Sequence, residues 1–131
     1  MTSGISEIVI DCADPYALSL FWAQVTGWVE DPDEPNEAGT DFAYLESPTG
    51  LGLLFQQVPE AKSVKNRVHL DVSPDDRTRD EEVARLVELG ATQIGDFREA
   101  DGTGWVVMAD PEHNEFCVLR SDAERAVTPA H

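Results

Sequence analysis

The sequence predicts an α+β fold made of two βαβββ modules in tandem, and three observations lead to this prediction. Each half of the chain contains an amphipathic helical stretch that ends in a glycine, Gly27 or Gly90. Each half then ends in two short apolar strands joined by a turn with a proline. Pro48 and Pro111 lie 63 residues apart, and the same offset brings Gly27 onto Gly90. A fixed offset of this kind indicates a repeated supersecondary unit.

The first module is expected over residues 5–57. Mixed alternation over 5–12 predicts a strand with one apolar face. Asp14 is expected to cap the following helix, and Pro15 occupies its first position, where a missing N–H costs nothing. A short strand at 28–29 and a hairpin at 42–56 complete the module. The apolar stripe of the helix is predicted to consist of Leu18, Phe21, Trp22 and Val25.

The second module is expected over residues 67–120. Strict alternation over 67–72 predicts a strand, and Thr78 with Glu81 has the spacing of a helix capping box. A strand at 91–97 and a hairpin at 105–119 follow. The helix stripe is predicted to consist of Val83, Leu86 and Val87. The two modules are predicted to form a single domain over 1–121, followed by a loosely ordered tail at 122–131.

Each helix should cover one face of its sheet and leave the other face open. The predicted sheets are curved, antiparallel or mixed, and their open faces line a concave cup where function is expected. Glu7 lies on the predicted open face of the first module. Arg67, His69 and Asp71 share the corresponding face of the second.

Composition excludes several classes of partner. The chain has 131 residues, 41% of them hydrophobic, and a formal net charge of −17. Nucleic acid and anionic membrane surfaces would be repelled, whereas a neutral or cationic small ligand would not. The acidity is equally explained by solubility alone. No signal peptide or membrane-length apolar run is visible, which predicts a cytoplasmic protein. Two cysteines do not form a disulfide framework.

Several motifs in this order resemble the vicinal oxygen chelate superfamily, which includes glyoxalase I, bleomycin-resistance proteins and extradiol dioxygenases. The resemblance covers about residues 5–120 and is greatest to the small glyoxalase-like group. It implies the tandem βαβββ fold and a homodimer. The motifs are Asp14-Pro15, Phe21-Trp22 and Thr26-Gly27-Trp28, then Asn66-Arg67-Val68-His69-Leu70-Asp71, Leu89-Gly90-Ala91-Thr92, and the segment from Asp110 to Leu119.

The resemblance also implies where a divalent metal would bind. Metal-dependent members use one residue from the first strand and one from the last strand of each half, usually His and Glu. Here those positions correspond to Glu7, Leu54, Arg67 and Cys117. Leucine has no donor atom and arginine stays protonated, so no metal site and no cofactor are predicted. A register slip would replace Leu54 by Gln56 or Arg67 by His69, and the set would still be unusual for a divalent ion.

Two interpretations remain open for the polar residues. Arg67, His69 and Asp71 either orient a ligand, with His69 as a base, or form an internal network in which Arg67 pairs with Asp71 or Glu7. Cys117 is interpreted as a small buried hydrophobe rather than a nucleophile.

Aromatic and loop residues also allow two interpretations. Trp105, Phe42 and Tyr44 either stack on a planar ligand or belong to the core. The acidic segment 30–41 is either a lid or a solvated connection.

The preferred functional hypothesis is a metal-independent protein that binds a small aromatic or apolar molecule. An alternative is a lyase, isomerase or dioxygenase-type enzyme that uses Glu7 and His69 as acid and base, or a non-standard metal site. A third is a structural homodimer with no open cavity. The residues predicted to line the site are Glu7, Tyr44, Gln56, Arg67, His69, Asp71, Trp105 and Cys117.

Overall fold

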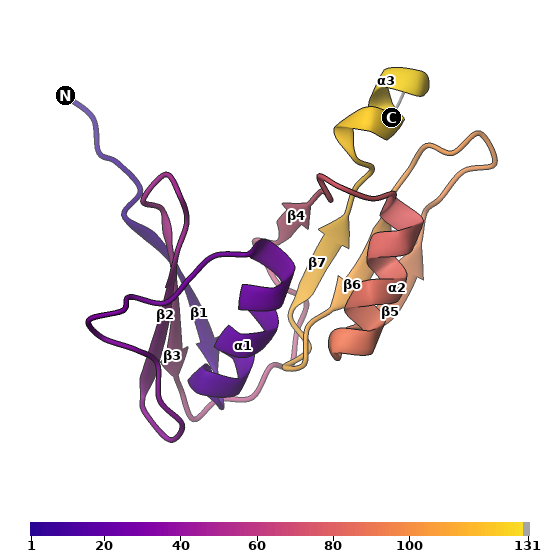
Figure 1. Ribbon diagram of the computed structural model, residues 1–131. Helices are drawn as coiled ribbons and strands as arrows, with labels where there is room; N and C mark the ends of the chain where they lie inside the picture. The colour runs from indigo at the N-terminus through magenta and orange to yellow at the C-terminus, as the bar shows by residue number, and fades with distance from the viewer. Residues whose placement is uncertain (130–131) are drawn as a thin grey trace. The chain divides into compact units, whose positions relative to one another are not determined.

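The structure is a computed structural model that describes residues 1–129. The chain divides into two compact units, Met1–Ser63 and a second that begins at Val64. Each unit contains one mixed sheet with a helix packed on one face (Figure 1). The predicted α+β architecture of two βαβββ modules is therefore confirmed.

The first unit contains a three-stranded sheet in the order β1-β3-β2. Strand β1 is parallel to β3, and β2 is antiparallel to β3. Val29 forms an isolated bridge with Glu46, in place of the short strand predicted at 28–29. The elements are β1 Glu7–Cys12, α1 Pro15–Thr26, β2 Phe42–Glu46 and β3 Gly52–Gln57.

Helix α1 begins and ends as the sequence predicts. The Asp14 side chain accepts a hydrogen bond from the Ala17 N–H at 3.1 Å, and Pro15 is the first helical residue. Gly27 ends the helix with a φ of 72°, a left-handed conformation that glycine adopts at little cost. The core between helix and sheet contains Leu18, Phe21, Trp22, Ala43, Leu45, Leu53 and Phe55.

The second unit has the strand order β4-β7-β6-β5, in which β4 is parallel to β7 and the other pairs are antiparallel. This order repeats that of the first unit if the Val29 bridge takes the place of β5. Its elements are β4 Leu70–Val72, α2 Arg79–Leu89, β5 Thr92–Asp96, β6 Val106–Ala109, β7 Glu115–Val118 and α3 Asp122–Val127. Its core contains Val83, Leu86, Val106, Met108, Phe116 and Val118.

The strand predicted at 67–72 is wrong for its first three residues, because β4 begins only at Leu70. The carboxylate of Glu115, the first residue of β7, accepts the Asn66 N–H at 3.0 Å. The segment before Leu70 is therefore held by a side chain rather than by the sheet ladder. Val68 is consequently 79% exposed instead of lying in the core.

Two further predictions need correction. Val87, assigned to the α2 stripe, is exposed. The tail predicted to be loosely ordered forms α3 over Asp122–Val127, and residues 130–131 lie outside the described residues. Ser121 and Glu124 form a reciprocal capping box that starts this helix, a spacing that the sequence already contains.

Within residues 1–129, no helix has the length and apolar character that a membrane crossing requires.

Adjacent residues of α2 provide a test of the core. Leu86→Ala should lower the free energy of unfolding by about 2–5 kcal/mol, because Leu86 is fully buried and its truncation leaves a cavity. Val87→Ala should change it by less than about 1 kcal/mol. Urea unfolding measures both. Equal losses would contradict the packing of α2 described above.

Candidate functional site

The open face of the first sheet carries a mixture of acidic and aromatic residues. Strand pairing places Glu7, Tyr44 and Gln56 on this face, with Phe42 directly opposite Gln56 and Tyr44 opposite Leu54. Phe42 is 54% exposed, and Tyr44 and Leu54 are half-buried. None of these rings belongs to the core of the unit.

A pocket of about 430 Å³ lies between this face and the acidic segment 30–41. The Asn36 side chain holds that segment in place, because its amide donates to the Tyr44 carbonyl at 2.9 Å and accepts from the Tyr44 N–H at 2.8 Å. The segment therefore borders a cavity on strand β2. The lining residues are Asp31, Glu34, Pro35, Asn36, Glu37, Thr40, Phe42, Ala43, Tyr44 and Leu54.

Tyr44 lies flat across Gly52, where a Cβ atom would fall only 2.3 Å from the tyrosine hydroxyl. Burial raises the pKa of the Tyr44 phenol, and the carboxylates of Glu46, Glu7 and Asp31 raise it further. The hydroxyl therefore stays protonated at neutral pH and is available as a hydrogen-bond donor.

The open face of the second sheet brings together an imidazole, a carboxylate and a thiol. Asp71 of β4 pairs in register with Cys117 of β7, and His69 immediately precedes β4. The His69 Nε2 atom lies 3.2 Å from Asp71 Oδ1. One potential ligand atom from each of the three residues lies within 4.8 Å of the others. His69 and Asp71 are exposed, whereas Cys117 is buried.

The thiol of Cys117 is held in its neutral form. Burial raises its pKa, and the charge and hydrogen bond of Asp71 add to the rise, while Lys65 opposes it. This environment is unfavourable for a nucleophilic cysteine, which requires a lowered pKa. Cys12 and Cys117 are both free, as the sequence predicts.

An aromatic pair lies on the same face. Phe97 and Trp105 flank the β5–β6 connection, and the Phe97 N–H donates to the Trp105 carbonyl at 3.0 Å. Their rings stack with centroids 5.3 Å apart and an interplanar angle of 20°. Phe97 is 51% exposed and Trp105 is 41% exposed. Trp105 has the same parity along the chain as Val107, which pairs with Cys117, so the rings share a face with the thiol.

The strand registers correct the predicted equivalence of Glu7 and Arg67. Leu70 pairs with Phe116, and Ile8 pairs with Leu53, which lies 63 residues before Phe116. His69 is therefore the equivalent of Glu7, and Arg67 lies two residues too early, outside the strand. The one-pair slip considered above, which replaces Arg67 by His69, describes the structure.

Apart from Trp105, described above, the predicted site residues fall into two groups and one outlier. His69, Asp71 and Cys117 come together, and Asp71 pairs with His69 rather than with Arg67. Glu7, Tyr44 and Gln56 share the open face of the first unit. Arg67 is exposed in a bend before β4.

Sequence reasoning missed Phe97 and Asn36. The sequence predicts a strand up to Phe97, but the pairing of Phe97 with Trp105 depends on the length of the turn between them. The available signal is that the two residues flank this turn at positions that alternate onto the same sheet face. Asn36 lies in a loop, and no pattern indicated its bonds to Tyr44.

Another pocket, of about 630 Å³, lies away from the open face of the second unit. It is bordered by the start of α2, by Gly102 and by α3. None of the predicted site residues lines it, so its size alone does not make it the functional site.

A family model described as a glyoxalase-like domain matches residues 7–119. The chain belongs to this glyoxalase-like family. This match agrees with the resemblance of the motifs above to the small glyoxalase-like group of the vicinal oxygen chelate superfamily. No curated protein is a significant match to the chain.

Solved structures of this superfamily share the fold of the glyoxalase-like chain. A glyoxalase/bleomycin resistance protein/dioxygenase family enzyme from Burkholderia phytofirmans is 22% identical, with a TM-score of 0.68, over 91% of this chain and 98% of that one. A Listeria monocytogenes fosfomycin resistance protein complexed with Mn(II) and a dihydroxypropylphosphonic acid is 17% identical, with a TM-score of 0.70, over 100% of both. A possible glyoxalase from Bacillus cereus is 19% identical, with a TM-score of 0.64, over 90% and 99%.

The thiol environment can be tested by titration in a Cys12→Ser background. Asp71→Asn should lower the pKa of Cys117, because removing a neighbouring negative charge favours the thiolate. Thiolate absorbance near 240 nm measures the pKa. Glu88→Gln, on the exposed side of α2, is the control and should leave it unchanged. An unchanged pKa in Asp71→Asn would contradict the contact between the two side chains.

Proposed function

We propose that this glyoxalase-like protein binds a small aromatic molecule, neutral or positively charged, against the open face of its second sheet. The observation that supports the proposal is the exposed Phe97–Trp105 pair, which lies on the same sheet face as the His69, Asp71 and Cys117 group. The rings offer a stacking surface, and His69 and Asp71 offer a donor and an acceptor elsewhere on the same sheet face. Few polar groups beside an apolar surface are typical of small-molecule sites.

The charge preference follows from the distribution of acidic residues. Residues 1–63 contain eleven acidic residues and a single basic one, Lys62. Three of those acids, Asp31, Glu34 and Glu37, line the pocket next to Tyr44 and Phe42, and no basic residue lines it. An anionic ligand would be repelled there, whereas a cation would gain from both the carboxylates and the aromatic faces. This pocket is proposed as a second contact surface for the same class of molecule.

Two probes of similar size and opposite charge test the proposal. We expect 1-naphthylmethylamine, protonated at neutral pH, to bind and to shift the NMR signals of the Trp105 indole and of His69. The anion 1-naphthoate should bind about tenfold more weakly, as expected for one unfavourable contact of about 1.4 kcal/mol. Trp105→Ala should weaken binding of the amine by about tenfold, because the stacking surface is lost.

Val87→Ala is the matched control, since Val87 is exposed on α2 and its truncation should leave affinity unchanged. Binding of neither probe, or equal effects of the Trp105 and Val87 variants, would overturn the proposed site. Tighter binding of the naphthoate would overturn the charge preference alone.

We also propose that the protein is a homodimer. The support is its membership of a superfamily whose members often form dimers that bind small molecules. Sedimentation equilibrium at several concentrations measures the mass, and a monomer at all of them would contradict the proposal.

A zinc-dependent enzyme is the second candidate, and the His69–Asp71–Cys117 group favours it. Imidazole, carboxylate and thiolate are all ligands of zinc, and three protein ligands with an open position are typical of catalytic zinc sites. Mg²⁺ and Mn²⁺ prefer oxygen ligands, so a thiolate makes them a poorer fit. A bound zinc ion would supply a Lewis acid that polarises a substrate carbonyl. Leu54, the equivalent of Cys117 in the first unit, has no donor atom and cannot be a metal ligand.

Zinc affinity can be measured by competition with a chromophoric chelator at several pH values. If the group binds zinc, affinity should rise from pH 6.5 to 8.5, because Cys117 must lose a proton whose pKa is raised. Cys117→Ser and His69→Ala should each lower affinity by at least about tenfold. The metal-free proposal predicts no tight binding in any variant, so the wild-type protein alone distinguishes the two candidates.

A further inference from the structure

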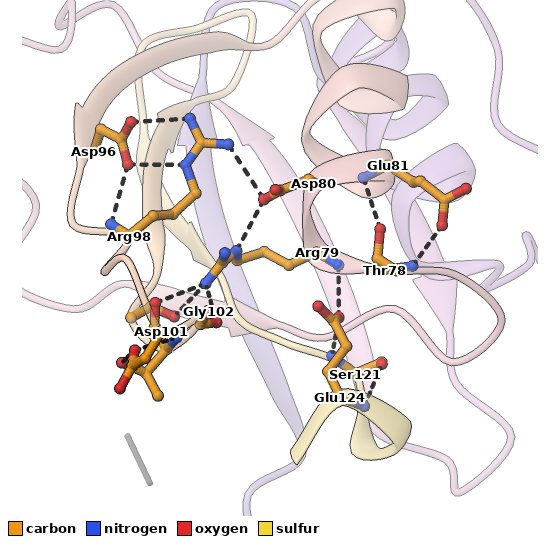
Figure 2. A network of polar contacts seen from close by, with 12 residues as sticks. Thr78, Arg79, Asp80, Glu81, Asp96, Arg98, Asp101, Gly102, Ser121 and Glu124 are labelled. Carbon is orange, nitrogen blue, oxygen red and sulfur yellow. Dashed lines mark hydrogen bonds and ion pairs between the residues drawn. The ribbon is translucent and has the colours of Figure 1, made fainter. Parts of the chain in front are cut away.

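The first turn of α2 lies next to the connection that carries the aromatic pair (Figure 2). Arg79 is the first residue of this helix, and its side chain is only 5% exposed. Its Nη1 atom donates to three successive carbonyls, those of Gly102 at 3.2 Å, Thr103 at 3.0 Å and Gly104 at 3.1 Å. Trp105 follows immediately. A buried guanidinium thus holds the backbone that leads into one ring of the pair.

The segment that carries the other ring, Phe97, is held through Asp80, the residue after Arg79 in α2. Asp80 accepts hydrogen bonds from Arg79 Nε at 3.1 Å and from Arg98 Nη1 at 3.2 Å. Arg98 in turn donates to both carboxylate oxygens of Asp96 at 2.9 Å. Phe97 lies between Asp96 and Arg98 in the chain. The two residues flanking it are therefore joined to each other and to α2.

Gly104 shows how closely these segments approach. A Cβ atom at this position would lie 2.0 Å from the Phe97 carbonyl oxygen, and the backbone has a φ of 91°. The segment that leads into Trp105 thus passes directly against the backbone of Phe97. A small displacement of the 102–104 segment would move the two rings relative to one another.

Arg79 is itself anchored by α3. Its backbone N–H donates to Glu124 Oε1 at 2.7 Å, and the same carboxylate oxygen accepts the Ser121 N–H at 2.9 Å in the α3 capping box. One carboxylate therefore caps two helices. A charge-assisted hydrogen bond to this carboxylate thus fixes the start of α2, from which the Arg79 side chain extends.

We infer that Arg79 is a positioning residue for ligand binding, which sets the geometry of the Phe97–Trp105 pair without itself contacting the ligand. The inference rests on the proposed function for its effect on affinity, but its structural part stands on the hydrogen bonds alone. A guanidinium is suited to this role, because a planar, permanently charged group can serve several carbonyls at once.

The test uses Arg79→Gln, with Arg85→Gln as the matched control. Arg85 lies on the same helix, and its guanidinium pairs with the Glu82 carboxylate at 2.6 Å. Hydrogen exchange of the Phe97 amide, which bonds to Trp105, reports on the pair without any ligand. Arg79→Gln should speed this exchange by at least about tenfold, since charge-assisted bonds are lost. The Leu119 amide, which bonds to Val72 in the sheet, should keep its rate.

Affinity for 1-naphthylmethylamine should fall by about tenfold in Arg79→Gln, the effect expected from losing the stacking geometry. It should be unchanged in Arg85→Gln. Arg79→Lys, which keeps the charge, should retain some of the bonds to the 102–104 carbonyls and recover part of both properties. If Arg79→Gln does not fold, Asp80→Asn replaces it, because this change weakens the link from Arg79 to Arg98 and leaves the three carbonyl bonds in place; Phe97 exchange should again become faster, by less than in Arg79→Gln.

Three outcomes separate the possibilities. Faster Phe97 exchange with weaker probe binding supports the inference. Faster exchange in a protein that binds no probe even as wild type supports the structural part and overturns the proposed function. Unchanged Phe97 exchange in Arg79→Gln, or an equal change in Arg85→Gln, overturns the inference.

Discussion

The parallel pairing of the first and last strands in each unit is the constraint on which the rest of the structure depends. Parallel strands cannot be joined by a tight hairpin, so a helix must cross over between them, and α1 and α2 do so. The crossover covers one sheet face and leaves the other without a layer. In the second unit this same pairing brings Asp71 beside Cys117. The core and the candidate site thus lie on opposite faces of the same sheet.

The second constraint acts at the start of α2, where a buried charge has to be satisfied. Burying a guanidinium is costly unless its N–H groups find acceptors. Arg79 finds them in the carbonyls of the tight turn at 102–104. Helix, turn and C-terminal helix are thereby held together by polar rather than apolar contacts. Because α3 buries no residue fully, the Glu124 carboxylate rather than a hydrophobic face is its evident anchor.

How much the sequence predicts depends on the range of the interaction involved. Helix limits were correct because Asp14, Gly27 and the Thr78 capping box act within a few residues. The position of His69 was not, because it depends on whether β7 reaches far enough to extend the ladder before Leu70. The tail at 122–127 failed for another reason. Its capping box was present in the sequence, but its partner Arg79 lies more than forty residues earlier.

The internal repeat offers an independent argument about the open faces. Equivalent positions on the helix-covered face stay apolar in both units, such as Leu53 with Phe116 and Ile8 with Leu70. The open-face positions do not follow each other in this way. Where the first unit has Leu54, the second has Cys117. His69 and Asp71 likewise occupy the positions of Glu7 and Val9.

The fold therefore does not require a thiol, an imidazole or a carboxylate at these positions, since the other unit builds the same ladder with different residues. Burying Cys117 beside Asp71 even raises the cost of ionising the thiol. Packing within the ladder thus does not account for these polar groups, and their place on the same face as exposed aromatic rings supports the proposed binding site. Trp105, by contrast, has an aromatic equivalent, Phe42, which borders the acidic pocket of the first unit. The two open faces share an aromatic position and differ in their polar groups, so each unit offers a different set of contacts on the same framework.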